Sequence, residues 1–91
     1  MFGERVKNLR LSLGLNQIEF GEKLNVTKQS VSNWENGNIQ PSIDMLIKIS
    51  MVFSVETDYL LGLDNNRKLD VTGLSDRQIS YIQQLVNDLK H

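Results

Sequence analysis

Hydrophobic residues recur at helical spacing at the start of the chain. Phe2, Val6, Leu9 and Leu13 follow one another at steps of four, three and four residues, which places them on one face of a helix. Gly14 comes next and favours the end of that helix. The pattern therefore predicts a first helix over residues 2–13 with one buried side.

The next segment, residues 16–37, predicts two short helices separated by a tight corner. Asn16 and Glu19 have the spacing of a capping box, so the first of the two helices begins there. Asn25 ends it, because asparagine tolerates the left-handed backbone that a sharp exit needs. Gly21 costs about 1 kcal/mol in helix propensity relative to alanine, which suggests a neighbouring helix at close range. With Phe20 and Leu24 it forms the expected inward face.

The second helix of this pair, about Lys28 to Asn36, begins after the capping residue Thr27 and divides into two sides. Val31 and Trp34 share the apolar side. The opposite side is uncharged apart from one lysine, and it consists of Lys28, Gln29, Ser32 and Asn33, with Ser30 between the two sides. Amide, hydroxyl and lysine side chains can read base edges in a DNA major groove, the amides bidentately. This pattern indicates a helix that reads bases.

Two further helices complete the predicted domain. Ser42 caps a fourth helix that runs to about Phe53, and a short fifth helix covers Thr57 to Leu61 and ends at Gly62. The expected core residues of the fourth helix are Ile43, Leu46, Ile47, Ile49 and Phe53, with Met45 and Met51 as packing residues. Tyr59, Leu60 and Leu61 are expected to close the bundle. The fold class is therefore all-α, with a five-helix bundle over residues 1–62.

The remainder of the chain predicts a linker and a separate helix. Residues 63–73 are polar and contain turn residues without helical periodicity. A helix over residues 74–91 follows, with Ser75 and Gln78 as a capping box and Leu74 and Ile79 as a hydrophobic staple. Its apolar stripe consists of Ile79, Ile82, Leu85, Val86 and Leu89. That stripe has to be buried somewhere.

Two ways of burying the stripe are open from the sequence. The helix either folds back on its own domain or meets the same helix of a second subunit in a two-heptad contact. Two heptads are too few for an isolated coiled coil, so a dimer would also need surface from the main domain. We favour the homodimer, because a two-fold dimer places two reading helices about 34 Å apart on successive major-groove faces.

The chain resembles the phage-repressor-like helix-turn-helix proteins of the Cro and Xre type. The resemblance rests on GLNQxEFGEKLNVTKQSVSNWENG, followed by PSIDMLIKIS and VETDYLLG, and covers roughly residues 2–62. It implies that Gln17 and Asn36 contact DNA phosphates and that Arg10 pairs with Glu35, a structural pair that could also leave a guanidinium edge near a phosphate. Thr27 and Ser30 are expected to contact phosphates as well. Many relatives carry Lys or Arg in the loop where this chain has Asn38 to Pro41, which weakens the expected hold on the DNA backbone.

Composition and charge narrow the function. The 91 residues carry a net charge of −1, and residues 1–62 hold six basic and seven acidic side chains, so random DNA should be held weakly. The chain has no cysteine and a single histidine, His91, which predicts no metal site and no cofactor. The sequence shows no paired catalytic carboxylates in a recognisable setting and no phosphate-cradling glycine loop, so we expect no enzyme. It shows no signal peptide and no membrane-length apolar run, so we expect a cytoplasmic location.

These observations predict a transcriptional regulator of the repressor kind. It would bind a two-fold double-stranded DNA operator as a homodimer, with the helix over residues 27–36 in the major groove and no small-molecule ligand. The alternative is a protein-interaction module, antitoxin-like or anti-repressor, that keeps the fold and uses its surface for a protein partner. The negative charge and the unbasic loop favour this alternative, whereas the polar side of the second helix argues against it.

Overall fold

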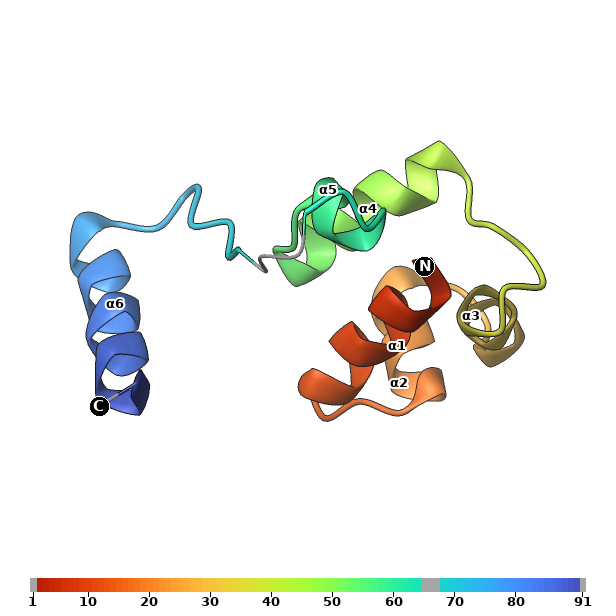
Figure 1. Cartoon of the computed structure of the whole chain (residues 1–91), viewed down its shortest axis with the longest axis horizontal. Helices are drawn as coiled ribbons and strands as arrows, with labels where there is room; N and C mark the ends of the chain where they lie inside the picture. The colour runs from red at the N-terminus through yellow and green to blue at the C-terminus, as the bar shows by residue number, and fades with distance from the viewer. Residues whose placement is uncertain (1, 65–67, 91) are drawn as a thin grey trace.

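The computed structural model describes residues 2–64 and 68–90, which form six α-helices (Figure 1). They are α1 (Phe2–Ser12), α2 (Gln17–Leu24), α3 (Lys28–Glu35), α4 (Ile43–Phe53), α5 (Thr57–Leu60) and α6 (Asp76–Lys90). The described residues contain no β-strand, and their isolated β-bridge joins Val55 to Leu69. The predicted all-α class is confirmed. The parts of the predicted domain, linker and last helix at residues 1, 65–67 and 91 lie outside the described residues.

The core of the bundle is built from the predicted inward faces of α1, α2 and α3 and is completed by residues of α4, α5 and the segment between them. Its buried apolar side chains are Val6, Leu9, Phe20, Leu24, Val31, Trp34, Ile49, Val55, Tyr59 and Leu60. The ring of Phe20 stacks on that of Phe53 with 4.5 Å between centroids, which ties α2 to α4. Helix α3 packs against both α1 and α2, while α4 packs against α2 and α5 against α1, in the red-to-green part of Figure 1.

The helix ends follow the local signals in the sequence. Asn16 and Glu19 make both hydrogen bonds of the capping box, at 2.8 and 2.9 Å. Asn25 adopts the left-handed conformation with φ 59°. Thr27 and Ser42 accept hydrogen bonds at the starts of α3 and α4. Local hydrogen bonding therefore sets where these helices start and where α2 stops.

Glycines mark two places where backbones come close. A Cβ at Gly21 would lie 2.7 Å from the carbonyl oxygen of Val26. The expectation that a neighbouring helix requires glycine here is therefore wrong, because the close neighbour is the corner after α2. A Cβ at Gly3 would lie 2.7 Å from the carbonyl oxygens of both Trp34 and Glu35. The start of α1 therefore lies directly against the end of α3, a contact that the sequence pattern did not indicate.

Several apolar residues predicted to be buried are exposed. Helix α1 ends one residue earlier than predicted, and Leu13, expected on its buried side, is 43% exposed. On α4, Ile43 is 77% exposed, Ile47 46% and Met51 74%, and Leu61 after α5 is also exposed. The core assignments of Ile43, Ile47 and Leu61 and the packing role of Met51 are therefore wrong for the single chain. The reason is that α4 is apolar on two sides, and only the side that carries Ile49 faces the bundle.

The segment after α5 is attached to the bundle over part of its length. Leu69 pairs with Val55, and the backbone N–H of Asp70 donates to the carbonyl oxygen of Ser54 at 3.3 Å. Ser75 and Gln78 then form the predicted capping box of α6, and no residue of α6 is buried. In Figure 1, α6 lies apart from the other five helices.

Candidate nucleic-acid interface

The position of α3 is fixed by its apolar side. Val31 is fully buried and Trp34 nearly so, and both belong to the bundle core. At the start of α3, the hydroxyl of Thr27 accepts from the backbone N–H of Ser30 at 3.1 Å. Lys48 of α4 donates to the carbonyl oxygen of Leu24 at 2.6 Å, which satisfies the end of α2 just before the corner. The two helices are therefore held at both sides of the turn between them.

The side chains predicted to read bases lie together on the outer side of α3. Lys28 and Gln29 are exposed, and Ser32 and Asn33 are half-buried. The amide nitrogen of Gln29 donates to the amide oxygen of Asn33 at 3.1 Å, so the two amides are aligned along the helix. The amide of Asn36 donates to the hydroxyl of Ser32 at 3.3 Å. The predicted polar side is thus a continuous row of hydrogen-bonding groups on one rigid element.

A buried ion pair joins α1 to the end of α3. Nε and Nη2 of Arg10 donate to the two carboxylate oxygens of Glu35 at 2.7 and 3.0 Å, and Nη1 donates to the carbonyl oxygen of Leu15 at 3.0 Å. Donation of hydrogen bonds to the Glu35 carboxylate raises the pKa of Arg10, burial of the guanidinium acts in the opposite direction, and the negative charge of Glu35 raises the pKa further. The Arg10–Glu35 pair suggested by the family resemblance is present. With these donors turned inward, a direct phosphate contact from Arg10 stays a prediction.

Gln17 belongs to the same network. Its amide nitrogen donates to Oε1 of Glu35 at 3.3 Å, a contact that sequence reasoning missed because the two residues lie 18 positions apart. Arg10, Asn16, Gln17, Ile18 and Lys28 line an open depression of about 400 Å³ at the start of α2. Free backbone N–H groups and the helix dipole favour an anion at such a helix start. The depression therefore brings three of the predicted DNA contacts, Arg10, Gln17 and Lys28, to one place.

Ile18 is a residue of this surface that we did not predict. It is half exposed beside Gln17 and lines the same depression. The sequence did contain a signal for it, because Ile18 is an apolar residue on the side of α2 opposite to the buried Phe20 and Leu24. The remaining predicted phosphate contacts, Thr27, Ser30 and Asn36, lie at the two ends of α3, with the hydroxyls of Thr27 and Ser30 3.2 Å apart.

The predicted dimer residues occupy a separate place. Ile79 and Ile82 are half-buried, whereas Leu85, Val86 and Leu89 are exposed, all on one side of α6. Within residues 2–64 and 68–90, no group of three histidine, cysteine or carboxylate side chains could hold a metal ion. Over the same ranges, no helix has the length and apolar character needed to cross a membrane.

Two short amphipathic helices joined by a tight corner, packed on a helical bundle with the polar side of the second one outward, define a helix-turn-helix domain. Comparison with known proteins agrees. Residues 6–60 match the helix-turn-helix family model. The chain is similar to the HTH-type transcriptional regulator ImmR of Bacillus subtilis, with 38% identity over 86 residues that cover 94% of this chain and 68% of ImmR. It spans between 56 and 60% of three further curated relatives.

Solved structures show the same likeness. The P22 c2 repressor, crystallised with a synthetic operator, matches 70% of this chain and 97% of its own, with 30% identity and a TM-score of 0.66. A SinR protein/SinI protein complex matches 99% of this chain and 98% of its own, with 28% identity and a TM-score of 0.63. The chain therefore belongs to the helix-turn-helix family, among the phage-repressor-like regulators of the Xre type. This is a family of DNA-binding transcriptional regulators rather than of enzymes, so the predicted functional class is confirmed.

Proposed function

We propose that this regulator is a repressor that binds a two-fold operator as a homodimer, with α3 in the major groove. The observation that carries the proposal is the outer row of α3, where Lys28, Gln29, Ser32 and Asn33 stand on a helix whose other side is locked into the core. The similarity to a repressor crystallised with its operator supports the same use of this helix. The cytoplasmic location follows from this function and stays a prediction.

Base reading and phosphate contact fall on different residues in this proposal. Lys28, Gln29 and Asn33, assisted by Ser32, read base edges because amides and lysine discriminate base pairs in the major groove. Gln17 at the start of α2, together with Thr27, Ser30 and Asn36, sets the register on phosphates. Arg10 acts on DNA mainly through Glu35, whose carboxylate holds the Gln17 amide beside the depression.

The dimer supplies affinity that charge does not. Few basic side chains in the bundle are available to neutralise phosphates, and the loop at residues 38–41 carries none. One reading helix covers only a few base pairs, whereas two on a two-fold axis double the contacts. The proposed dimer surface is the α6 stripe of Ile79, Ile82, Leu85, Val86 and Leu89, of which the last three are exposed.

The test begins with selection of a preferred duplex from a random pool, followed by measurement of its affinity with one and with two half-sites. Sedimentation gives the oligomeric state of the full chain and of a chain that ends at Leu63. We expect a dimer that becomes a monomer on truncation, and a two-half-site affinity that falls by about a hundredfold or more with it. An intact dimer after truncation would remove α6 from the interface.

A second candidate function is recognition of a protein partner. The observation that favours it is the match to a SinR protein/SinI protein complex, which extends over nearly the whole chain, α6 included. Salt dependence separates the two functions. DNA affinity should fall log-linearly as salt rises, with a slope set by the number of phosphates contacted. A full-length chain without salt-sensitive binding to any selected duplex would favour the protein partner.

A further inference from the structure

The outer side of α4 carries an apolar stripe that nothing in the described chain covers. Ile43, Ile47 and Met51 follow at steps of four residues and so share an arc of about 80°. All three are exposed, Ile43 and Met51 by about three quarters of their surface and Ile47 by 46%, although α4 also buries Ile49 on its opposite side. A helix that is apolar on two sides is normally covered on both. We call these three residues the α4 stripe.

A second uncovered apolar surface lies on α6 of the same chain. Its five residues, Ile79 to Leu89, span an arc of about 120°, wider than the seam of a simple two-helix coiled coil. The α4 stripe extends over about 12 Å and the α6 stripe over about 15 Å at 1.5 Å per residue. The two stripes are therefore comparable in length, and each lacks the surface that the other could provide.

The segment before α6 directs this helix away from its own bundle. Leu69 and Asp70 are bonded to Val55 and Ser54 beside the end of α4. A turn follows in which the backbone N–H of Thr72 donates to the Asp70 carboxylate at 2.9 Å and that of Leu74 to the carbonyl oxygen of Val71 at 3.0 Å. After this turn α6 extends away from α4, as Figure 1 shows. The α6 stripe is therefore accessible to another molecule.

We infer that the α6 stripe of one copy docks on the α4 stripe of a second copy, and reciprocally, so that the two chains exchange their last helices. This inference rests on the homodimer of the proposed function and identifies the main-domain surface that completes it. A reciprocal exchange obeys the two-fold symmetry of most homodimers, because each chain gives one helix and receives one.

The area available argues for the exchange over pairing of α6 with α6 alone. Burial of one large aliphatic side chain removes about 60–120 Å² of apolar surface, on the usual conversion of transfer free energy to area. Only Leu85, Val86 and Leu89 of the α6 stripe are exposed, so they supply roughly 180–360 Å² per chain, well below the roughly 800 Å² per partner of a specific interface. Adding the three exposed α4 residues doubles this to roughly 360–720 Å², which comes much closer to that size.

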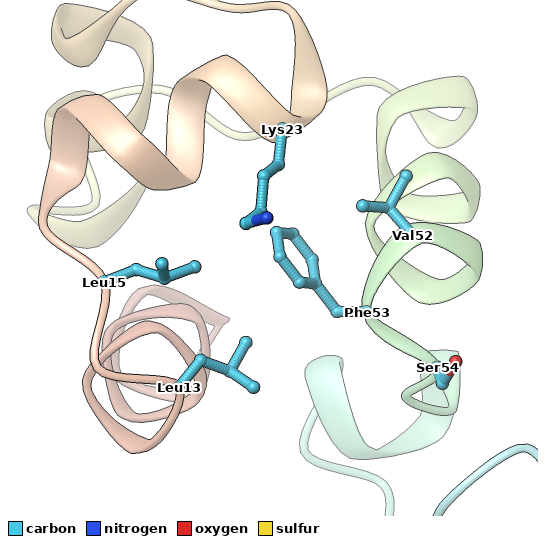
Figure 2. A pocket seen from close by; sticks show the side chains of 6 residues that line it. All are labelled: Leu13, Leu15, Lys23, Val52, Phe53 and Ser54. Atoms are coloured by element: carbon cyan, nitrogen blue, oxygen red, sulfur yellow. The ribbon is translucent and has the colours of Figure 1, made fainter.

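A groove on the other flank of α4 is the competing place for the helix. Leu13, Leu15, Lys23, Val52, Phe53 and Ser54 line this cavity of about 560 Å³. Figure 2 shows the ring of Phe53 filling its centre beside the Lys23 side chain. The ring of Phe53 thus already fills part of this groove, and the Lys23 side chain adds a positive charge to it. The α4 stripe, in contrast, consists of apolar side chains only. The α4 stripe is the better match for a stripe of five aliphatic side chains.

Cysteine trapping tests the contact, because the natural chain has no cysteine. Full-length Ile47→Cys chains and uniformly ¹⁵N-labelled Ile82→Cys chains are mixed in equal amounts and oxidised, so that the three linked dimers differ in mass and are counted by mass spectrometry. Exchange predicts that the mixed dimer exceeds half of all linked dimers. A majority of Ile82-to-Ile82 dimers would overturn the proposal in favour of pairing between α6 helices alone.

Two matched trapping experiments exclude the other places for α6. A double Ile47→Cys, Ile82→Cys chain that closes an internal disulfide at high dilution would overturn the proposal, because each helix would then cover its own bundle. Mixing Leu13→Cys with Ile82→Cys tests the groove, and efficient linkage there would overturn the proposal as well. Leu11→Cys is the control for random collision, since Leu11 is exposed outside both surfaces.

Sedimentation separates failure of the exchange from failure of the proposed function. Ile47→Gln should weaken dimerisation by about tenfold or more, whereas Leu11→Gln should leave it unchanged, with circular dichroism to check folding. Equal dimerisation of the two variants, or a monomeric natural chain, overturns the exchange. Affinity for a single half-site is measured in parallel and reports on the DNA contacts of one bundle, independently of dimerisation, so DNA binding can stand when the exchange does not.

Discussion

The helices of the bundle and α6 have the same capping and periodicity signals in the sequence, but the former are buried on one side and α6 is not. Helix α2 begins with the Asn16–Glu19 capping box and α6 with the Ser75–Gln78 box, and both place apolar residues on one side. Helix α2 buries Phe20, Gly21 and Leu24, whereas α6 buries no residue. Caps and periodicity are therefore sufficient to specify a helix, but burial depends on whether the rest of the chain supplies an opposing surface.

The largest expected difference between the two regions concerns apolar truncation. Phe20→Ala should lower the free energy of unfolding by about 3–5 kcal/mol, because it removes a fully buried ring and leaves a cavity beside Phe53. Leu89→Ala should change it by less than about 0.5 kcal/mol in the monomer, because this side chain is exposed. Urea unfolding at a concentration low enough to keep the chain monomeric measures both. A comparable loss for Leu89→Ala would mean that α6 packs on its own bundle.

Ion pairs give the next largest difference. Glu35→Ala leaves the buried Arg10 without its carboxylate and should cost about 3 kcal/mol. Asp64→Ala removes an ion pair with Lys68 that lies outside the bundle, at 3.4 Å and with Lys68 largely exposed, and should cost less than about 1 kcal/mol. The measurement is again urea unfolding. The double variant Arg10→Met, Glu35→Leu is the control, and it should be less destabilised than Glu35→Ala if the cost comes from an unpaired charge.

Alanine variants of three glutamines should distinguish base reading, phosphate contact and no contact with DNA. Gln29→Ala should cost about 1–3 kcal/mol at particular base pairs, because its amide stands in the row of α3 that we propose reads bases. Gln17→Ala should weaken binding to matched and scrambled duplexes alike. Gln83→Ala on α6 is the matched control and should leave both affinities unchanged. The measurement is fluorescence anisotropy on the selected operator and on single-base variants of it, and equal losses on all duplexes for Gln29→Ala would contradict a base-reading role.

The smallest expected difference concerns the two capping boxes. Asn16→Ala should lower the unfolding free energy of the bundle by about 1 kcal/mol, because α2 is part of the cooperative core. Ser75→Ala removes the matching cap of α6 and should lower helical content without moving the unfolding midpoint of the bundle in the monomer. Circular dichroism during urea titration reports both quantities. A shifted midpoint for Ser75→Ala would show that α6 unfolds together with the bundle.

The candidate interface divides in the same way between what was predictable and what was not. The polar row on α3 is local, so helical periodicity alone placed Gln29 and Asn33 on one side. The contact between Gln17 and Glu35 joins two helices, and no local signal indicates it. The exposure of Ile43, Ile47 and Met51 also escaped prediction, because an apolar residue on a helix carries no mark that tells which of two apolar sides faces the core.

The sequence by itself determined the helices, their caps, the corner at Asn25 and the helix-turn-helix class. These features depend on hydrogen bonds and side-chain periods within a few residues, which physical rules read directly from the chain. Only the tertiary structure decided that Gly21 faces the Val26 carbonyl, that α1 meets α3 at Gly3, and that α4 keeps an apolar side in solvent. Those outcomes depend on how whole helices pack against one another, and a distance across the fold is fixed by every intervening contact at once.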